Sequence, residues 1–174
     1  LGAVALWSSK SLAEILDPYL VMLNSLPKSA LAPILIVWLG SSMRTIVAAA
    51  VSVAVFGSIL TLHNGFMSMD PDQARLIRSL GGGKREILFK VLLPGSVPLI
   101  ISNMKVNIGL CLVGVIIGEF LAAKEGLGYL IIYSSQVFKM DWLLMSICLL
   151  CLFAMCLYAL INRLESCYLK RNKR

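Results

Sequence analysis

Three consecutive glycines followed by a lysine, in the stretch LIRSLGGGKREILFKVLLP, raise the question of a phosphate-binding loop. A Walker A loop reads G-x-x-x-x-G-K-[ST], where the first glycine shapes the turn and the final hydroxyl binds magnesium. If Lys84 were its lysine, that first glycine would fall on Arg78 and the hydroxyl on Arg85. The dinucleotide pattern G-x-G-x-x-G also fails, because its third glycine would fall on Glu86. We therefore predict that the glycine run does not bind a nucleotide.

The cysteines and the histidine do not form a reactive pattern. Cys148 and Cys151 make a CxxC pair inside an uncharged run, where cysteine behaves as a small hydrophobic residue. The single histidine, His63, lies far from them in the sequence. Neither a Ser-His-Asp arrangement nor a paired-carboxylate site is evident. We predict that the cysteines pack, and that the chain has no catalytic residue, no metal site and no cofactor of its own.

Polar side chains within apolar segments are candidates for a solute pathway or a gate. Glu119 is a candidate because an intramembrane carboxylate is by default functional. It lies close to the predicted outer end of its span, where a carboxylate can reach water or bond to nearby backbone, and we favour this structural role. Amides and hydroxyls could bind a solute or join neighbouring helices. Lys28 and Lys105 could attract an anion, snorkel or pair across helices. The candidates are Asn24, Ser25, Asn103, Asn107 and Glu119.

The composition indicates that these residues are positioned by membrane helices. Of 174 residues, 59% are hydrophobic and only 14% are charged, with a mean hydropathy of +0.86. Soluble domains carry about 25% charged residues. Residues 45–62 and 142–162 are free of formal charge and long enough to cross a bilayer. A buried helix of a large soluble protein would explain one such block, but not several in so short a chain.

Basic residues predict the orientation. Five of the 16 Lys and Arg residues lie in residues 75–90 and five in residues 163–174, whereas residues 121–141 carry two basic and two acidic residues. The positive-inside rule puts the two basic segments in the cytoplasm and the balanced one outside. Crossings are then expected at 17–39, 45–62, 92–120 and 142–162, the third broken early by Pro94 and Pro98. The net charge of +7 is explained by this topology and by anionic lipid rather than by nucleic acid.

The whole chain, 1–174, is expected to form a single transmembrane domain. Residues 70–93 form a cytoplasmic loop within it, and residues 163–174 a basic cytoplasmic tail. The chain begins with Leu1 rather than methionine, and LGAVALW reads as the end of an apolar helix. We therefore expect a longer subunit, with an incomplete N-terminus here, and treat the number of spans as a lower bound.

The loop at residues 70–93 is predicted to form two short helices joined by a glycine corner. Asp70 is a good N-cap and Pro71 suits the first helical position. Apolar stripes run along both helices: Leu76, Ile77 and Leu80 on the first, and Ile87, Leu88, Val91 and Leu92 on the second. The glycines permit positive φ and close approach of another backbone. The alternative is an amphipathic loop lying on the lipid surface.

The spacing in this loop resembles the cytoplasmic signature of permease subunits of bacterial ABC importers: EAA, three residues, Gly, nine residues, then I-x-L-P. With its glycine on Gly81, the closing positions fall on Val91, Leu93 and Pro94, a match apart from Val for Ile. The EAA positions fall on Arg75, Leu76 and Ile77, a clear departure.

Two further stretches resemble the branch of this family that includes nitrate, sulfonate, taurine and thiamine-precursor importers. LDPYL followed by LPKSALAPILIVWLG, within residues 16–40, is similar to the second core span, and GEFLAAKEGLGYLI at 118–131 to a segment near the outer face. The resemblance covers residues 16–165.

The resemblance implies an all-α, polytopic membrane bundle of the ABC importer permease fold in the bacterial inner membrane. It implies a second permease subunit, expected to be a copy, two ATPase subunits that bind ATP and Mg, and an extracytoplasmic solute-binding protein. Residues 72–90 would couple to the ATPase and Val91, Leu93 and Pro94 would position the loop. The expected ATPase contacts are Arg75, Leu76, Ile77, Arg78, Ser79, Leu80, Gly81, Gly82, Gly83 and Lys84.

The implied cargo is a small polar or anionic solute, such as a sulfonate, taurine, nitrate or a vitamin precursor. Two other classes remain open. A channel or secondary transporter would need its own coupling-ion site instead of an ATPase dock, and a membrane-embedded enzyme would need catalytic groups. The spacing from Gly81 to Pro94 favours the permease.

Overall fold

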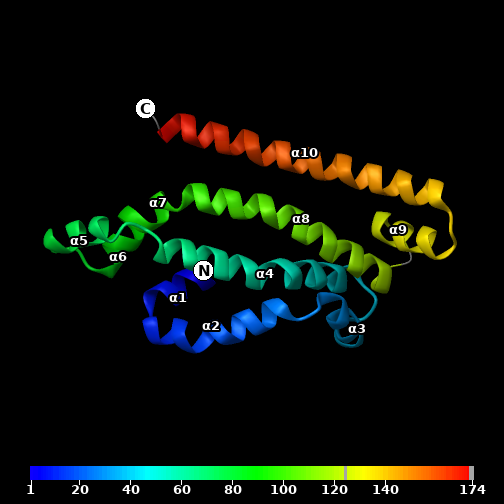
Figure 1. The fold of residues 1–174 in the computed structure, drawn as a ribbon, viewed down its shortest axis with the longest axis horizontal. Coiled ribbons are helices and arrows are strands. Elements are labelled where there is room, and N and C mark those ends of the chain that lie inside the picture. The colour runs from blue at the N-terminus through cyan, green and yellow to red at the C-terminus, as the bar shows by residue number, and fades with distance from the viewer. Residues whose placement is uncertain (124, 173–174) are drawn as a thin grey trace. The chain divides into compact units, whose positions relative to one another are not determined.

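The computed structural model describes residues 1–123 and 125–172, and this part of the chain is helical, with no β-strand (Figure 1). The helices are α1 (Gly2–Ser8), α2 (Lys10–Ser25), α3 (Lys28–Leu39), α4 (Met43–Met67), α5 (Pro71–Ser79), α6 (Lys84–Ile87), the π-helix η1 (Leu88–Leu92), α7 (Leu93–Gly95), α8 (Val97–Ala122), α9 (Leu127–Gln136) and α10 (Met140–Asn172). The predicted all-α class is confirmed.

Three helices in the described part of the chain are long and apolar enough to cross a membrane: α4, α8 and the Met140–Arg163 part of α10. They contain the crossings predicted at 45–62 and 142–162. The crossing predicted at 92–120 starts later, at Val97, because η1 and α7 precede it and the helix is interrupted at Ser96. Pro98 does not break the helix as expected. It occupies the second position of α8, where a backbone N–H has no intrahelical partner to lose.

The crossing predicted at 17–39 is not one straight helix. α2 begins earlier, at Lys10, and α2 and α3 are bent by 93° at a short break, so the pair is a broken span or a re-entrant loop. Pro27 lies in this break. A proline disfavours helical geometry in the residue before it and has no N–H to donate, which ends α2 before Leu26.

The C-terminal segment is not separate from the last span. α10 continues through Asn172, so the described part of the predicted basic tail, 163–172, prolongs that helix. Lys173 and Arg174 lie outside the described residues. Apolar side chains remain exposed along α10, including Leu144, Leu152, Phe153 and Leu160. Such a surface fits lipid or another membrane helix rather than water.

The chain divides into two compact units, each described by itself. Unit 1 consists of Leu1–Leu23 and Phe56–Met104. Its core is formed by Ala3, Phe66 and Leu92, with partly buried apolar side chains packed around them: Val4, Trp7, Leu62, Met69 and Leu88. Within this unit Gly65 of α4 lies directly against the Leu99 side chain of α8. Unit 1 therefore ties the end of α4 and the start of α8 to α1 and to the loop at 70–93.

Unit 2 consists of Asn24–Val55 and Lys105–Arg174. Within it the backbones of α4 and α8 meet at two glycines four residues apart. A Cβ atom on Gly114 would lie 2.5 Å from the Cα of Ala50, and one on Gly118 would lie 2.8 Å from the Cα of Ile46. Small residues at this spacing let membrane helices approach closely. α10 packs against α9 in the same unit.

Candidate functional site

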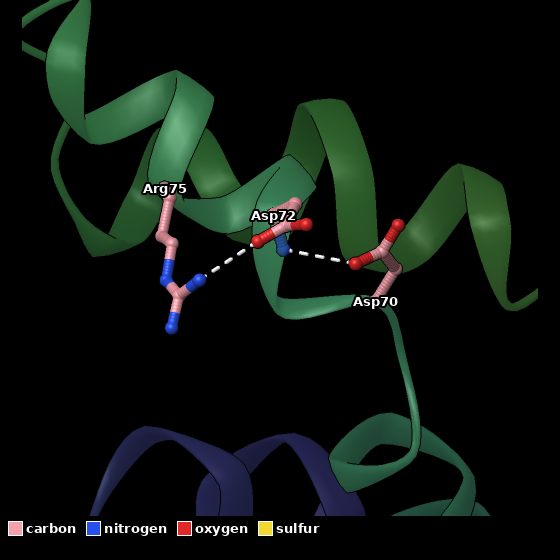
Figure 2. Close-up of polar contacts among 3 residues, drawn as sticks. All are labelled: Asp70, Asp72 and Arg75. Atoms are coloured by element: carbon pink, nitrogen blue, oxygen red, sulfur yellow. Dashed lines mark hydrogen bonds and ion pairs between the residues drawn. The ribbon is translucent and has the colours of Figure 1, made fainter.

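The first helix of the loop begins where the sequence predicts. The Asp70 carboxylate accepts a hydrogen bond of 2.9 Å from the Asp72 N–H (Figure 2). Pro71 takes the first position of α5. The Arg75 guanidinium forms an ion pair of 2.8 Å with Asp72, also drawn in Figure 2. Both side chains are exposed, so this pair stabilises the helix by at most about 1 kcal/mol. It nevertheless holds Arg75, an expected ATPase contact, against its own helix.

The glycine run ends α5 with a Schellman motif. Gly81 has φ +81°, and its N–H donates to the Arg78 carbonyl at 3.0 Å. The Gly82 N–H donates to the Ile77 carbonyl at 2.9 Å. These two bonds satisfy carbonyls that a helix end leaves without partners. The motif needs the left-handed backbone at Gly81, which costs a residue with a Cβ about 1–2 kcal/mol.

The next two glycines have other roles. A Cβ atom on Gly82 would lie 2.5 Å from the Cγ2 and 2.9 Å from the carbonyl oxygen of Ile77, so this position requires close backbone approach. Gly83 is the N-cap of α6, and its N–H donates to the Glu86 carboxylate at 2.8 Å. Hydrogen bonds from the backbone N–H groups of Glu86 itself and of Gly83 lower the pKa of this carboxyl from its ordinary value of 4.5. The glycines thus build a defined corner.

The corner is held to the rest of unit 1 by one polar contact and by apolar burial. The Lys84 ammonium donates to the Ser8 carbonyl, at the end of α1, over 3.3 Å. Ile87 and Leu92 are only 4% and 3% exposed. The four side chains of the second stripe therefore form the packed side of the loop, with Leu88 and Val91 half-buried.

The second side of the loop is not the regular α-helix that the sequence pattern predicts. α6 is four residues long and continues as η1, where the Leu93 N–H donates to the Leu88 carbonyl five residues back. Because Pro94 has no N–H, the Lys90 carbonyl lacks its α-helical donor, and a wider turn precedes the proline. The three expected positioning residues flank this turn: Val91 and Leu93 are half-buried and Pro94 is exposed.

The first stripe behaves differently, because it is exposed. Leu76 and Leu80 are 61% and 76% exposed, and Ile77 is half-buried against the corner. Apart from Gly81 itself and its two chain neighbours, no atom of the described chain lies within 4 Å of the place where a Gly81 side chain would begin. Together with Ser79 and the basic side chains of Arg75 and Arg78, these positions form an accessible surface that is apolar at its centre and basic at its edge. We call it the corner surface.

The candidate pathway residues fall in three places. Asn24 and Ser25 are exposed at the end of α2, beside the bend. Asn103, which is buried, and Asn107, which is half-buried, are one turn apart on the same face of α8. Glu119 is near the other end of α8. The structure therefore does not gather the five into one polar cluster, and their role in a pathway stays a prediction.

Glu119 caps a helix. Its carboxylate accepts a hydrogen bond of 2.7 Å from the N–H of Gly128, in the first turn of α9. Gly126, the N-cap, has φ +112°, and a Cβ atom there would lie 2.5 Å from the Glu119 carboxyl carbon. A negative charge at a helix N-terminus pairs with unsatisfied N–H groups and the positive end of the dipole. The hydrogen bond to Gly128 therefore corresponds to the structural role considered for Glu119 from the sequence, in which its carboxylate bonds to nearby backbone.

Lys105 makes a contact that the sequence motifs do not reveal. Its ammonium lies 2.5 Å from the Glu165 carboxylate of α10, with the two side chains 19% and 25% exposed, and 5.6 Å from the centre of the Tyr158 ring. Of the roles left open for Lys105, the structure shows pairing across helices. The available signal was the lysine itself, because a cation within an apolar span needs a partner.

In the described part of the chain, no group of three or more His, Cys, Asp or Glu side chains is placed to hold a metal ion. Cys148 and Cys151 are free and exposed on α10. The Cys167 side chain lies outside the described residues. Cys148 and Cys151 thus face the surroundings of the helix rather than a polar site.

Three helices that are long and apolar enough to cross a membrane, two of them joined by a structured basic loop, define the class of multi-pass membrane proteins. Comparison with known families agrees with this class. Residues 1–166 match the family described as "Binding-protein-dependent transport system inner membrane component", and the chain belongs to that family. Its members are transport components of the inner membrane, which confirms the resemblance seen in the sequence.

Individual relatives are similar over most of the chain. It is 26% identical over 162 residues to the "Probable ABC transporter permease protein" of Haemophilus influenzae, which is 93% of this chain and 66% of that protein. It is 27% identical over 174 residues to the "Formylaminopyrimidine transport permease protein ThiX" of Halalkalibacterium halodurans, 100% of this chain and 69% of that protein. It is 25% identical over 152 residues to the "Taurine transport system permease protein TauC" of Escherichia coli, which is 87% of this chain and 55% of that protein. The chain thus spans roughly half to two thirds of these relatives.

Proposed function

We propose that this chain is the membrane-spanning permease subunit of an ATP-driven ABC importer. Its spans form part of a translocation pathway for a small polar or anionic solute. The names of its relatives support this solute class, because they specify formylaminopyrimidine, taurine and aliphatic sulfonates. The resemblance in the sequence adds nitrate. The partners are a second permease subunit, expected to be a copy, two ATPase subunits and an extracytoplasmic solute-binding protein.

The observation that carries the proposal is the corner surface. Leu76 and Leu80 are apolar yet exposed, on a loop whose opposite side is packed. Exposed apolar side chains at a structured, basic-edged protrusion suit a partner protein that buries them. The vacant space beside Gly81 would let the partner backbone approach closely. The spacing from Gly81 to Pro94 resembles the signature of loops that dock in a groove of the ATPase subunit, so we take the ATPase as this partner.

The departure at the EAA positions changes the charge of the proposed contact. Arg75 stands where the family signature has an acidic residue, but its partner Asp72 lies one turn earlier on the same face. A carboxylate is thus retained beside the corner surface. We assign the polar part of the ATPase contact to this Asp72–Arg75 pair.

The mechanism follows from the rigidity of the corner. The Schellman bonds, the Gly83–Glu86 bond and the buried Ile87 and Leu92 fix the corner surface to the inner ends of α4 and α8. When ATP and Mg close the ATPase pair, a push on this surface would be passed on as a rigid-body movement of the spans. The chain supplies the path and the contact, and the chemistry occurs in the partner.

Site-directed cross-linking tests the contact. In a cysteine-free background of the full-length subunit, Leu80→Cys should cross-link to the ATPase with a short bismaleimide, because Leu80 is exposed at the centre of the corner surface. Gln136→Cys, at a position that is also exposed, at the end of α9, is the matched control and should not cross-link. Failure at Leu80 in a transport-competent complex, or an equal product at Gln136, would contradict the proposal.

A ligand screen of the cognate binding protein tests the solute class. A thermal shift with taurine, an alkanesulfonate, nitrate or formylaminopyrimidine supports it. Uptake that proceeds without any ATPase would favour the channel or secondary transporter.

A further inference from the structure

A cavity of about 340 Å³ lies in unit 1, beside the corner but apart from the two exposed leucines. Its walls come from the end of α4, from α5 and α6, and from η1, and Trp7 of α1 also lines it. The volume falls in the range of pockets that hold small ligands. Arg78 and Lys84, which line this cavity, are also expected ATPase contacts, but the coupling role leaves the cavity itself without an assigned occupant.

The lining separates into an apolar floor and a basic mouth. Phe66, Ile87 and Leu92 belong to the floor and are all buried. Arg78 and Lys84 are exposed and line the same cavity. The one acidic residue in the lining is Asp70, and its carboxylate already accepts the Asp72 N–H at 2.9 Å as the cap of α5. The mouth therefore offers two cations over an apolar base.

Both cations retain donors for a ligand. An ammonium group has three N–H donors, and the described contacts of Lys84 use one, to the Ser8 carbonyl at 3.3 Å. Within residues 1–123 and 125–172, the Arg78 guanidinium forms no hydrogen bond or ion pair. Its planar fork of donors matches the geometry of a phosphate group. The mouth is thus suited to a phosphate-bearing anion.

The position of the cavity indicates where this anion comes from. Phe66 and Met67 end α4, whose apolar run crosses the membrane, and the loop beyond them is the basic segment that the positive-inside rule puts in the cytoplasm. The cavity is therefore expected at the level of the inner-leaflet headgroups. A tryptophan ring such as Trp7 favours that level, and basic side chains there are attracted to anionic lipids.

We propose that this cavity binds the headgroup of one anionic phospholipid of the cytoplasmic leaflet. The phosphate bonds to Arg78 and Lys84, and the glycerol and first methylene groups cover the floor of Phe66, Ile87 and Leu92. A soluble anion would leave this floor in contact with water. A phosphatidylcholine would bring a third cation next to the two in the mouth.

Native mass spectrometry of the full-length subunit, purified with the subunits that accompany it, tests the site. With phosphatidylglycerol and phosphatidylcholine added in turn, we expect phosphatidylglycerol to bind at least tenfold more tightly. Arg78→Gln and Lys84→Gln should each weaken its binding about fivefold, as expected for one cation near an anionic headgroup. Arg85→Gln is the matched control, because Arg85 is an exposed neighbour that does not line the cavity.

A second variant tests the cavity without altering its charge. Ala74 lines the space, and Ala74→Leu should fill part of it and weaken phosphatidylglycerol binding while both cations remain. Lys84→Arg should keep binding within about threefold, which shows that the fold survives substitution there.

Three results would overturn the proposal: equal binding of the two lipids, a loss in Arg85→Gln as large as in Arg78→Gln, or displacement of the lipid by an equal concentration of soluble glycerol phosphate. The measurement involves no ATP hydrolysis. A failure of the proposed coupling role would leave its outcome unchanged.

Discussion

Gly81, Gly82 and Gly83 are adjacent, yet each lacks a side chain for a different reason. Gly81 has a positive φ in open space, Gly82 lies against the backbone of Ile77, and Gly83 caps α6. A run that resembles a phosphate loop in composition is thus used to end one helix and start another within a few residues. The resulting corner needs no ligand to define its shape.

These different reasons predict different costs of substitution. Gly81→Ala should destabilise the corner by about 1 kcal/mol because of its φ of +81°, and Gly81→Asn by less, since Asn tolerates this conformation. Gly82→Ala should cost more than either, because its Cβ atom would lie 2.9 Å from a backbone oxygen. Hydrogen exchange at the Gly81 and Gly82 amides measures the change. Equal effects of Asn and Ala at position 81 would argue against the Schellman geometry.

Among individual residues, the sequence correctly predicts the structural roles that depend only on near neighbours in the chain. Asp70 as N-cap and Pro71 as first residue are read correctly, because a cap depends only on its next few neighbours. The π turn before Pro94 is missed, since a stripe of Ile87, Leu88, Val91 and Leu92 fits an α-helix equally well. Which of the two geometries forms depends on a carbonyl that loses its donor, and this leaves no trace in hydrophobic periodicity.

At the scale of the helix, Glu119 determines how α9 begins. Glu119→Gln should lower stability by about 1–2 kcal/mol, because the charged acceptor at the N-terminus of α9 is lost. Glu125→Gln, an exposed carboxyl in the same connection, should change it by less than about 0.5 kcal/mol. Thermal unfolding of the purified subunit gives the comparison, and hydrogen exchange at Gly128 locates the effect. Equal shifts for the two variants would rule out a specific cap.

The spans are the elements that sequence predicts best, and their joints the ones it predicts worst. Uncharged runs such as 45–62 must be helical in a bilayer, so composition suffices for α4. The sequence does not predict the bend of 93° between α2 and α3, although it contains Pro27 at that point. A proline predicts an interruption but not an angle, because the angle is set by what the second helix packs against.

Across the whole molecule, the ion pair between Lys105 and Glu165 joins residues 60 apart in the chain. Lys105→Met should destabilise by about 1–2 kcal/mol, because it leaves the Glu165 carboxylate without its partner in a poorly hydrated position. The double variant with Glu165→Met should recover at least half of this loss. Lys139→Met is the control, since Lys139 is exposed and lies over Trp142. Thermal unfolding tests the cycle; strictly additive losses would show that the pair is not coupled.

Pairings of this kind lie beyond the sequence. A lysine within an apolar span predicts that some carboxylate pairs with it, but the sequence contains several carboxylates. Which of them pairs with Lys105 depends on how α8 is rotated relative to α10. The same holds for the cap of α9. The sequence shows that the Glu119 carboxylate needs a partner, but only the fold determines that this partner is the N-terminus of α9.

The contact between α4 and α8 in unit 2 has a mechanical consequence. Gly114 and Gly118 lie against the backbone of Ala50 and Ile46, and neither glycine contributes a side chain that would keep the two helices apart. Such a seam is stiff, so these stretches should act as a single lever during transport. Movement is then left to softer joints, such as the interruption at Ser96 and the bend before Lys28. A bulkier residue at Gly114 would push the two helices apart, so that they would no longer move together as one body.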